Sequence, residues 1–358
     1  MTDRAPFHDP PPVPNDLDDL KSWLTRDSGW TQPTVYSCAD FWLNLGCDDF
    51  HLYAVISSWF ESDVIQAAVQ NCFRHGCNRV YLLDNDSPDT TVATARAAGA
   101  ELLESYHTDY YQEELRVKLL NQHLQRIVST ERYPVLWVVC LDADEFLHAP
   151  RGLRFRDYLA HLDPTCNTVP MQSIDHYPSP GSTRHNERGL HPAEFQPLVW
   201  LRRTPTFCQH GHWKHPCYRY RNGVVDGCFM RGCHTPLLKR GRCLVEPTEH
   251  LWLHHIPFRN EDFTRARLQA LCGAQDRLGG QRRSAPDDQR LAGEGAIKRF
   301  RCLDDIYAGR WDRIELPHAQ GSEQKVGVPV RPWIDLLPHA DYQFLRWYGT
   351  DDIRLTNP

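Results

Sequence analysis

The chain has 358 residues, of which 41% are hydrophobic and 24% are charged, and its formal net charge is −6. This is the composition of an ordinary globular protein with one large or two moderate domains, and the acidic balance argues against a nucleic-acid-binding surface. No apolar stretch approaches the length of a transmembrane helix, and the composition of the first residues leads us to expect no signal peptide. We therefore expect a cytoplasmic protein with reduced cysteines, and peripheral attachment to a membrane stays open.

The first half of the chain alternates strand-like and helix-like segments. After a proline-rich arm and a short helix within residues 1–50, apolar runs predict strands at 51–57, 79–83, 101–103 and 135–142. Apolar spacing and capping residues predict helices at about 62–75, 90–98 and 111–129. Strands and helices that alternate at this spacing indicate an α/β fold of Rossmann-like type. Its central sheet should be mostly parallel, with helices on both faces.

The second half of the chain is less regular. Beyond residue 151, prolines, histidines, cysteines and aromatic residues interrupt the pattern, and strand-like pieces lie near 167–175, 197–204 and 224–233. A further helix is expected at 260–277, followed by a mobile Gly- and Arg-rich loop at 279–295.

Three carboxylates lie within four residues at the end of the most apolar predicted strand. Asp142, Asp144 and Glu145 follow the run Val-Leu-Trp-Val-Val-Cys-Leu, which is typical of a central strand buried on both faces. Open α/β sheets bind their ligands at the carboxyl ends of such strands. Burying these carboxylates unpaired would be costly, and a divalent cation, Mn²⁺ or Mg²⁺, is the simplest compensation. The alternative is an acidic turn at the end of a strand.

A second polar turn follows the second predicted strand. It reads Asp-Asn-Asp-Ser-Pro-Asp from Asp84 to Asp89 and directly precedes a predicted helix. An aspartate at this position, such as Asp84 or Asp86, can accept hydrogen bonds from a base or a ribose. The alternative is a turn whose aspartate only caps the following helix.

In their order, these pieces resemble bacterial glycosyltransferases of family 2 type, especially the branch akin to family 92. That branch has an Asn-Glu pair, an Asp-Asn-x-Ser-x-Asp-Gly-Thr turn, a Leu-Asp-Ala-Asp-Glu-Phe motif and a His-x-Pro-x-Arg-Ser segment. The matching segments here, within roughly residues 51–275, are 60–61, 84–91, 141–146 and 255–260. The family has Asn, Gly and Ser where this chain has Phe60, Thr90 and Asn260.

The resemblance implies a GT-A fold, a nucleotide-sugar donor, with a UDP-sugar favoured, and Mn²⁺ or Mg²⁺ as the cofactor. It implies that Asp142 and Asp144 bind the metal and the diphosphate, and that His255 ligates the metal or touches the diphosphate. The residues expected to bind the donor are Glu61, Asp84, Asp86, Arg116 and Arg259. For Arg116, an ion pair with a neighbouring glutamate on the same helix is the alternative to a phosphate contact.

A segment rich in histidine and cysteine, residues 208–243, is the candidate acceptor region. Its ligand-type residues lack the Cys-x₂-Cys spacing typical of structural zinc, although a zinc site stays open as an alternative. Aromatic and imidazole groups suit the faces and hydroxyls of sugars. Gly232-Cys233-His234 resembles a Gly-Asn-His segment of the family branch, which makes His234 the candidate catalytic residue. The alternative is a histidine buried in the core.

The sequence therefore predicts a metal-dependent glycosyltransferase of hexosyltransferase type that inverts the anomeric centre, with an unidentified glycan, lipid-linked or small-molecule acceptor. The expected division is an arm (1–50), a nucleotide-sugar-binding half (51–150), an acceptor-binding half (151–275) and a C-terminal extension (276–358). The competing hypotheses are a non-catalytic or zinc-stabilised binding module, a nucleotide-sugar hydrolase, and a nucleotidyltransferase. The last would need an early glycine-rich phosphate loop, and residues 51–63 contain no glycine.

Overall fold

The computed structural model of the protein describes residues 35–36, 49–108, 112–131, 133–149, 153–162, 164, 166–176, 199–200, 213–233, 237–238, 242–244, 251–277, 300 and 303–308. Several sequence predictions lie outside these residues. They are the short amino-terminal helix, the loop at 279–295, most of the C-terminal extension, the candidate catalytic residue His234, and Cys208, His210 and His212 of the histidine- and cysteine-rich segment.

Four parallel strands form the part of the sheet that the sequence predicts most completely. They are β2 (His51–Ser58), β3 (Arg79–Asp84), β4 (Glu101–Ser105) and β5 (Val135–Asp142). Their order in the sheet is β5-β2-β3-β4, and each neighbouring pair is parallel. The predicted strands in this half of the chain and their parallel pairing are therefore confirmed.

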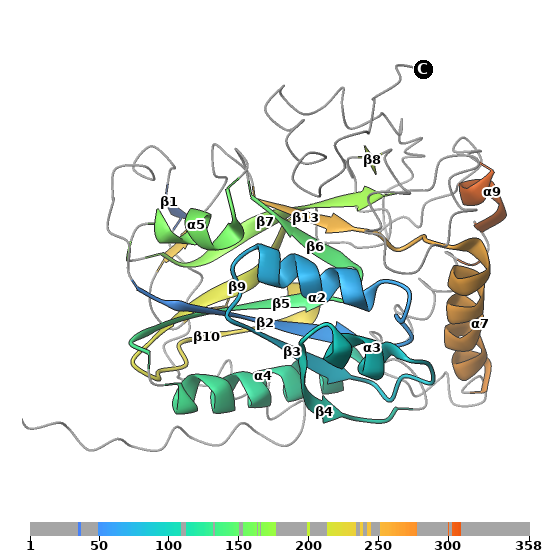
Figure 1. The fold of residues 1–358 in the computed structure, drawn as a ribbon, viewed down its shortest axis with the longest axis horizontal. Coiled ribbons are helices and arrows are strands. Elements are labelled where there is room, and N and C mark those ends of the chain that lie inside the picture. The colour runs from blue at the N-terminus through green and yellow to red at the C-terminus, as the bar shows by residue number, and fades with distance from the viewer. Residues whose placement is uncertain are drawn as a thin grey trace, which may run out of the picture.

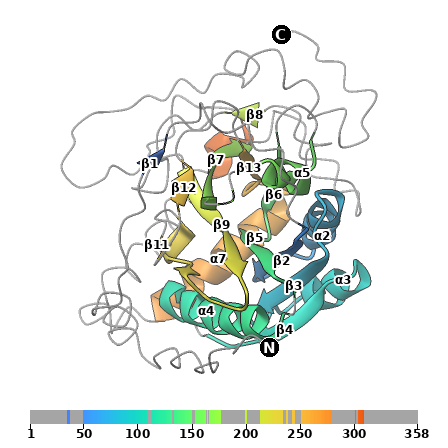
Figure 2. The same cartoon turned by 90° about the vertical axis from the view of Figure 1, so that its left-hand side faces the viewer.

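Helices cover both faces of these strands, as Figures 1 and 2 show. Leu52, Ala54 and Ile56 of β2 belong to one core cluster, which also contains residues of α2 (Ile65–Arg74), α3 (Thr91–Ala97) and α5 (Phe155–Ala160). Tyr53 and Val55, which alternate with them, belong to a second cluster with residues of α4 (Glu113–Thr130). Because successive side chains of a strand point to opposite faces, this division confirms a sheet that is buried on both sides.

The sheet continues beyond β5 with strands from the second half of the chain. β9 (Trp213–Arg221) pairs antiparallel with β5, and β7 (Cys166–His176) pairs antiparallel with β9. The short strands β12 (Arg242–Leu244), β1 (Val35–Tyr36) and β8 (Val199–Trp200) extend this edge. The predicted strand near 224–233 is confirmed only in part. Only β10 (Gly227–Cys228) forms there, paired with β11 (Leu237–Leu238), and a 3₁₀ helix, η4 (Arg231–Cys233), follows.

Two strands and a helix complete the edge where β5 ends. β6 (Glu145–His148) follows β5 after a tight turn, and β13 (Trp252–His255) pairs antiparallel with β6 and parallel with β7. The predicted helix at 260–277 is confirmed as α7 (Glu261–Arg277), which Figure 1 shows beyond the end of β13, close to α9 (Leu303–Tyr307). Within the described part of the chain, no helix has the length and apolar character needed to cross a bilayer.

Candidate active site

The aspartate motif occupies the turn between β5 and β6. Asp142 ends β5, and its backbone N–H donates to the Glu145 carboxylate at 3.0 Å. The next N–H, of Ala143, donates to the Ser57 carbonyl at the end of β2, at 3.1 Å. Ser57 and Asp142 are register partners in the parallel ladder, so the motif lies at the carboxyl end of the sheet, where the sequence places it. That position is the ligand-binding edge of open α/β sheets.

Asp142 is held between two cations from different elements. An Arg116 guanidinium nitrogen on α4 lies 2.9 Å from one carboxylate oxygen, and the Lys214 ammonium on β9 lies 3.5 Å from the other. Lys214 also contacts the buried carboxylate of Glu145. Burial would raise the pKa of Asp142, but Arg116 and Lys214 outweigh it and hold that pKa below its ordinary value. The Asp142 side chain remains 39% exposed, so this ionised carboxylate stays open to a ligand.

Arg116 is itself fixed by Glu113, one helical turn earlier on α4. The two side chains form a pair of hydrogen bonds, each 2.7 Å long, which is the bidentate geometry of a strong arginine–carboxylate pair. Glu113 also accepts the backbone N–H of Gly232 in η4 at 2.9 Å. The ion pair within α4 that the sequence offered as the alternative to a site role is therefore present together with the contact to Asp142.

Asp144 faces a different set of cations. One of its carboxylate oxygens lies 3.6 Å from the His255 imidazole, 3.7 Å from the Arg259 guanidinium and 3.8 Å from the Arg267 guanidinium. Burial would raise the pKa of Asp144, but His255 and the two arginines lower it well below its ordinary value. The register of β13 explains this contact, because His255 is the partner of Glu145 and the Ile256 N–H donates to the Asp144 carbonyl at 2.9 Å.

Glu61 and Arg259 meet at the same place but are occupied with each other. The buried Glu61 carboxylate is hydrogen-bonded by both Arg259 and Arg267. Arg259 also bonds Asp63, at 2.7 Å and 3.1 Å, and the Ile256 carbonyl at 3.0 Å. Burial raises the pKa of Glu61 to about 7 although the two arginines oppose this. The two predicted donor-binding residues thus belong to a buried network that contacts Asp144 through Arg259.

Asp84 and Asp86 take different positions in the turn after β3. Asp84 is completely buried and accepts hydrogen bonds from the Ser58 hydroxyl at 2.6 Å and from the Ser87 N–H and hydroxyl at 2.8 Å and 2.6 Å. Asp86 has a left-handed backbone with φ of 48°, and its exposed carboxylate lies 3.1 Å from His107. Asp84 therefore shapes the turn, and Asp86 is open to solvent at its rim.

Three charged residues of the site escaped the sequence reading: Lys214, Arg267 and Asp63. Lys214 lies just beyond an irregularity of the β7–β9 ladder, where the register shifts between Val169 and Met171. The residues between the paired positions include Pro170 and Pro216, which have no N–H to donate to a ladder. Side-chain direction does not follow from simple alternation across such a shift. Arg267 could have been suspected from the sequence, because it lies on the predicted helix that directly follows the Arg259 segment.

The site has the donors and the charge for a divalent cation. Burial raises the pKa of Glu61 and of Glu145, whereas neighbouring cations lower the pKa of Asp142 and of Asp144, so the two aspartates are the ionised donors of the site. Among the described residues, no three His, Cys, Asp or Glu side chains form a ready metal cage. Mg²⁺ and similar ions are usually held by one or two carboxylates together with substrate phosphates, so Asp142 and Asp144, with His255 beside them, fit such an ion.

Comparisons with known proteins leave the family open. No protein-family model matches the chain, and no curated protein matches it. Mannosyl-3-phosphoglycerate synthase from Rubrobacter xylanophilus matches over 36% of this chain and 40% of its own, with 17% identity and a TM-score of 0.24. Glucosyl-3-phosphoglycerate synthase from Mycobacterium tuberculosis, solved with Mn²⁺ and uridine diphosphate, matches over 39% of this chain and 48% of its own, with 14% identity and a TM-score of 0.24. The chain thus spans less than half the length of these two proteins, and at this TM-score the likeness assigns neither fold family nor activity.

Proposed function

We propose that this protein is a metal-dependent glycosyltransferase of GT-A type, which transfers a sugar from a nucleotide-diphosphate donor to an acceptor hydroxyl. The observation that carries the proposal is the Asp142–Asp144 turn, which lies at the ligand-binding edge of a mostly parallel sheet and is surrounded by fixed cations. A UDP-sugar is the favoured donor, because the segments in 51–146 resemble the donor-binding motifs of family 2-type enzymes. Residues 51–150 would bind the donor and residues 151–275 the acceptor.

The chemistry of such a transfer explains the charges of the site. Breaking the bond between the sugar and the diphosphate leaves negative charge on the departing diphosphate, and fixed cations stabilise that charge. Mn²⁺ or Mg²⁺, held by Asp142 and Asp144 with His255, would neutralise the diphosphate. Arg116 and Lys214 keep Asp142 ionised and oriented, and Glu113 holds Arg116 in place. These positions are set before a ligand arrives, so little reorganisation is needed during the reaction.

The remaining residues have distinct proposed roles. Asp86 would border the nucleoside as the accessible carboxylate of the turn after β3, and the buried Asp84 would hold that turn in place. Glu61 and Arg259 support the donor site through the buried network beneath Asp144. We propose an inverting reaction, which needs one further group to take the proton from the acceptor hydroxyl, and His234 is the candidate for this general base.

Nucleotide binding by the aspartate variants tests the proposal. Asp142→Asn and Asp144→Asn should each abolish Mn²⁺-dependent binding of UDP in calorimetry, because a neutral amide binds a hard divalent cation much more weakly than an ionised carboxylate does. Asp157→Asn is the matched control, since Asp157 lies on α5 in a solvent-accessible pair with Arg154 and should leave UDP affinity unchanged. Circular dichroism would check that the variants fold. Folded Asp142 and Asp144 variants that bind UDP with wild-type affinity would refute the proposed donor site.

A further inference from the structure

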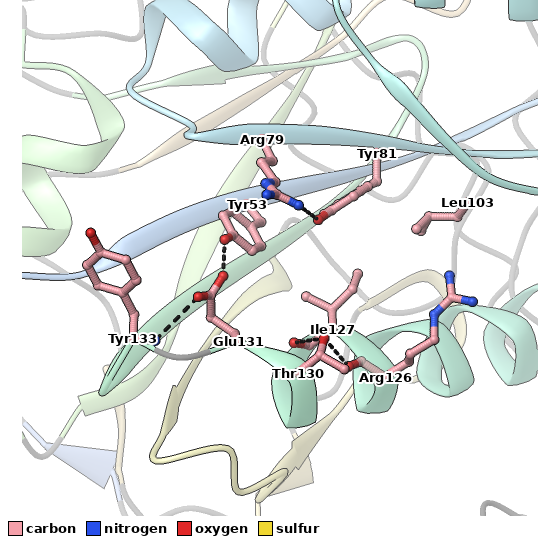
Figure 3. A pocket seen from close by; sticks show the side chains of 9 residues that line it. All are labelled: Tyr53, Arg79, Tyr81, Leu103, Arg126, Ile127, Thr130, Glu131 and Tyr133. Carbon is pink, nitrogen blue, oxygen red and sulfur yellow. Dashed lines mark hydrogen bonds between the residues drawn. The ribbon is translucent and has the colours of Figure 1, made fainter.

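A pocket of about 480 Å³ lies at the other end of the strands from the aspartate motif. Figure 3 shows its walls, which come from β2, β3 and β4 on one side and from the end of α4 and the segment after it on the other; they are Tyr53, Arg79, Tyr81, Leu103, Arg126, Ile127, Thr130, Glu131 and Tyr133. Arg79 begins β3, whereas Asp142 pairs with Ser57 near the end of β2. Along α4, the ten residues between Arg116 and Arg126 correspond to about 15 Å. The pocket is therefore separate from the candidate active site.

The walls of this pocket present hydrogen-bond donors. Arg79 donates to the Tyr81 hydroxyl at 3.2 Å, and its guanidinium lies 5.8 Å from the centre of the Tyr53 ring. Tyr81 is only 7% exposed, and no described residue accepts its hydroxyl proton. The Arg126 guanidinium has neither a hydrogen bond nor an ion pair with any described residue, and Figure 3 shows it at the rim. Two guanidinium groups and a hydroxyl are thus available to a ligand.

The single carboxylate among the lining residues is already engaged. Glu131 accepts a hydrogen bond from the Tyr53 hydroxyl, and its carboxylate lies 3.6 Å from His51. It therefore offers little to a ligand cation. The carboxyl end of α4 carries partial negative charge, which opposes an anion at this place. The arginines must supply the attraction for any anion that binds, which makes their removal a decisive test.

We propose that this pocket binds a small anion that carries a ring, with a carboxylate or a phosphate as its charged group. Guanidinium groups match the oxygen pairs of both anions, and tyrosine rings offer flat surfaces for the ring of the ligand. The volume lies in the range of small-molecule sites. The arginines Arg79 and Arg126 would bind the charged group, Tyr81 would donate to it, and Tyr133, which is 40% exposed, would contact the ring.

Titration with model anions tests this site. Phenyl phosphate and benzoate, which represent the two kinds of charged group, are titrated into the full chain by calorimetry, with phenol as the neutral control. We expect at least one anion to bind more tightly than phenol, with affinity that falls as salt is added. Absence of binding by both anions at millimolar concentration would overturn the proposal. Binding of only one anion would identify which charged group the pocket takes.

Variants locate the binding and separate it from the active site. Arg126→Gln and Arg79→Gln should each weaken anion binding by about tenfold, as expected for a lost hydrogen bond to a charged group. Arg96→Gln, which removes an exposed arginine of α3, is the matched control and should have no effect. The Arg126 and Arg79 variants should keep wild-type affinity for UDP with Mn²⁺. Anion binding that survives both substitutions, or that is lost in Asp142→Asn instead, would contradict the assignment to this pocket.

Discussion

Asp142 and Asp144 lie two residues apart but meet different cations. Arg116 and Lys214 hold Asp142 from α4 and β9, whereas Asp144 faces the cations of β13 and α7. Asp142 keeps 39% of its side chain exposed and Asp144 only 11%. Asp142 is therefore the more accessible of the two carboxylates, and it also has the shorter cation contact, at 2.9 Å to Arg116.

Substitution of Lys214 tests how much the buried cations of the site contribute to the stability of the protein. Its side chain is 14% exposed and stands between Asp142 and Glu145, so Lys214→Met would leave a buried negative charge without a partner. We expect a loss of roughly 3–5 kcal/mol in the free energy of unfolding, measured by urea denaturation. Lys214→Arg, which keeps the charge, should recover much of this loss.

The matched control for Lys214 is an exposed ion pair on α5. Arg154→Met removes the partner of Asp157, where both side chains are well exposed, at 52% and 35%. Solvent screens such pairs, so the loss should stay below about 1 kcal/mol. Equal losses for Lys214→Met and Arg154→Met would show that Lys214 does not act as the buried counter-ion of the site.

The pairing of β6 with β13 contains a second buried contact, between two histidines. His148 of β6 lies 3.0 Å from His254 of β13, nitrogen to nitrogen, and both residues are buried. One ring nitrogen must donate and the other must accept, so protonation of the accepting nitrogen removes the hydrogen bond. Burial lowers the pKa of His148 from 6.5 to about 3. This strand pair carries His255 and the segment after it to the aspartate motif, so its stability matters for the site.

The lowered pKa of His148 predicts a loss of stability in mild acid. Below pH 6.5 the unfolded chain binds a proton at this histidine, whereas the folded chain stays neutral until about pH 3. The stabilisation is thus fully present above pH 6.5 and is lost as the pH falls towards 3. Urea midpoints between pH 7 and pH 4 should fall less steeply for His148→Gln than for the wild type. His107→Gln, which removes a histidine whose side chain is 69% exposed, should keep the wild-type slope, and equal slopes in all three proteins would contradict the prediction.

Across the whole molecule, the Glu61–Arg259 contact ties segments that are 198 positions apart in the chain. Glu61 follows β2, and Arg259 lies between β13 and α7, so this contact helps to hold α7 at the carboxyl end of the parallel strands (Figure 1). Asp63 and Arg267 belong to the same buried network. The position of the Asp144 carboxylate therefore depends on the packing of both halves of the chain.

Removal of Arg259 should affect both stability and ligand binding. Arg259→Met leaves Glu61 and Asp63 without their shared cation, and we expect a loss of roughly 3–5 kcal/mol in the free energy of unfolding. Mn²⁺-dependent binding of UDP should weaken as well, because Asp144 loses part of its support. The control is Arg265→Met on α7, whose partners Glu261 and Asp304 are exposed, and which should change neither quantity appreciably. An Arg259→Met protein as stable as this control would show that the Glu61–Arg259 contact does not stabilise the packing of α7 against the sheet.

Local patterns were sufficient to place the motif that matters most. The apolar run that ends at Asp142 is long and uninterrupted, so its burial, its strand structure and the place of the aspartates at the sheet edge all followed from the sequence. The alternating segments in 51–142 likewise predicted the parallel strands and the helices between them, whereas the order of these strands in the sheet came from the structure. The sequence analysis did not predict β9. Its segment contains Pro216 and several charged residues, which are unusual in a central strand, and the structure places it between β5 and β7.

The sequence alone determined that carboxylates gather at the end of a buried strand, because hydrophobic periodicity and turn residues act over short distances. Only the tertiary structure decided which cations meet these carboxylates. Lys214 reaches Asp142 from an antiparallel strand beyond a register shift, and Arg267 reaches Asp144 and Glu61 from a helix more than a hundred residues later. Such contacts depend on how distant elements pack, and a single sequence carries no local signal for that packing.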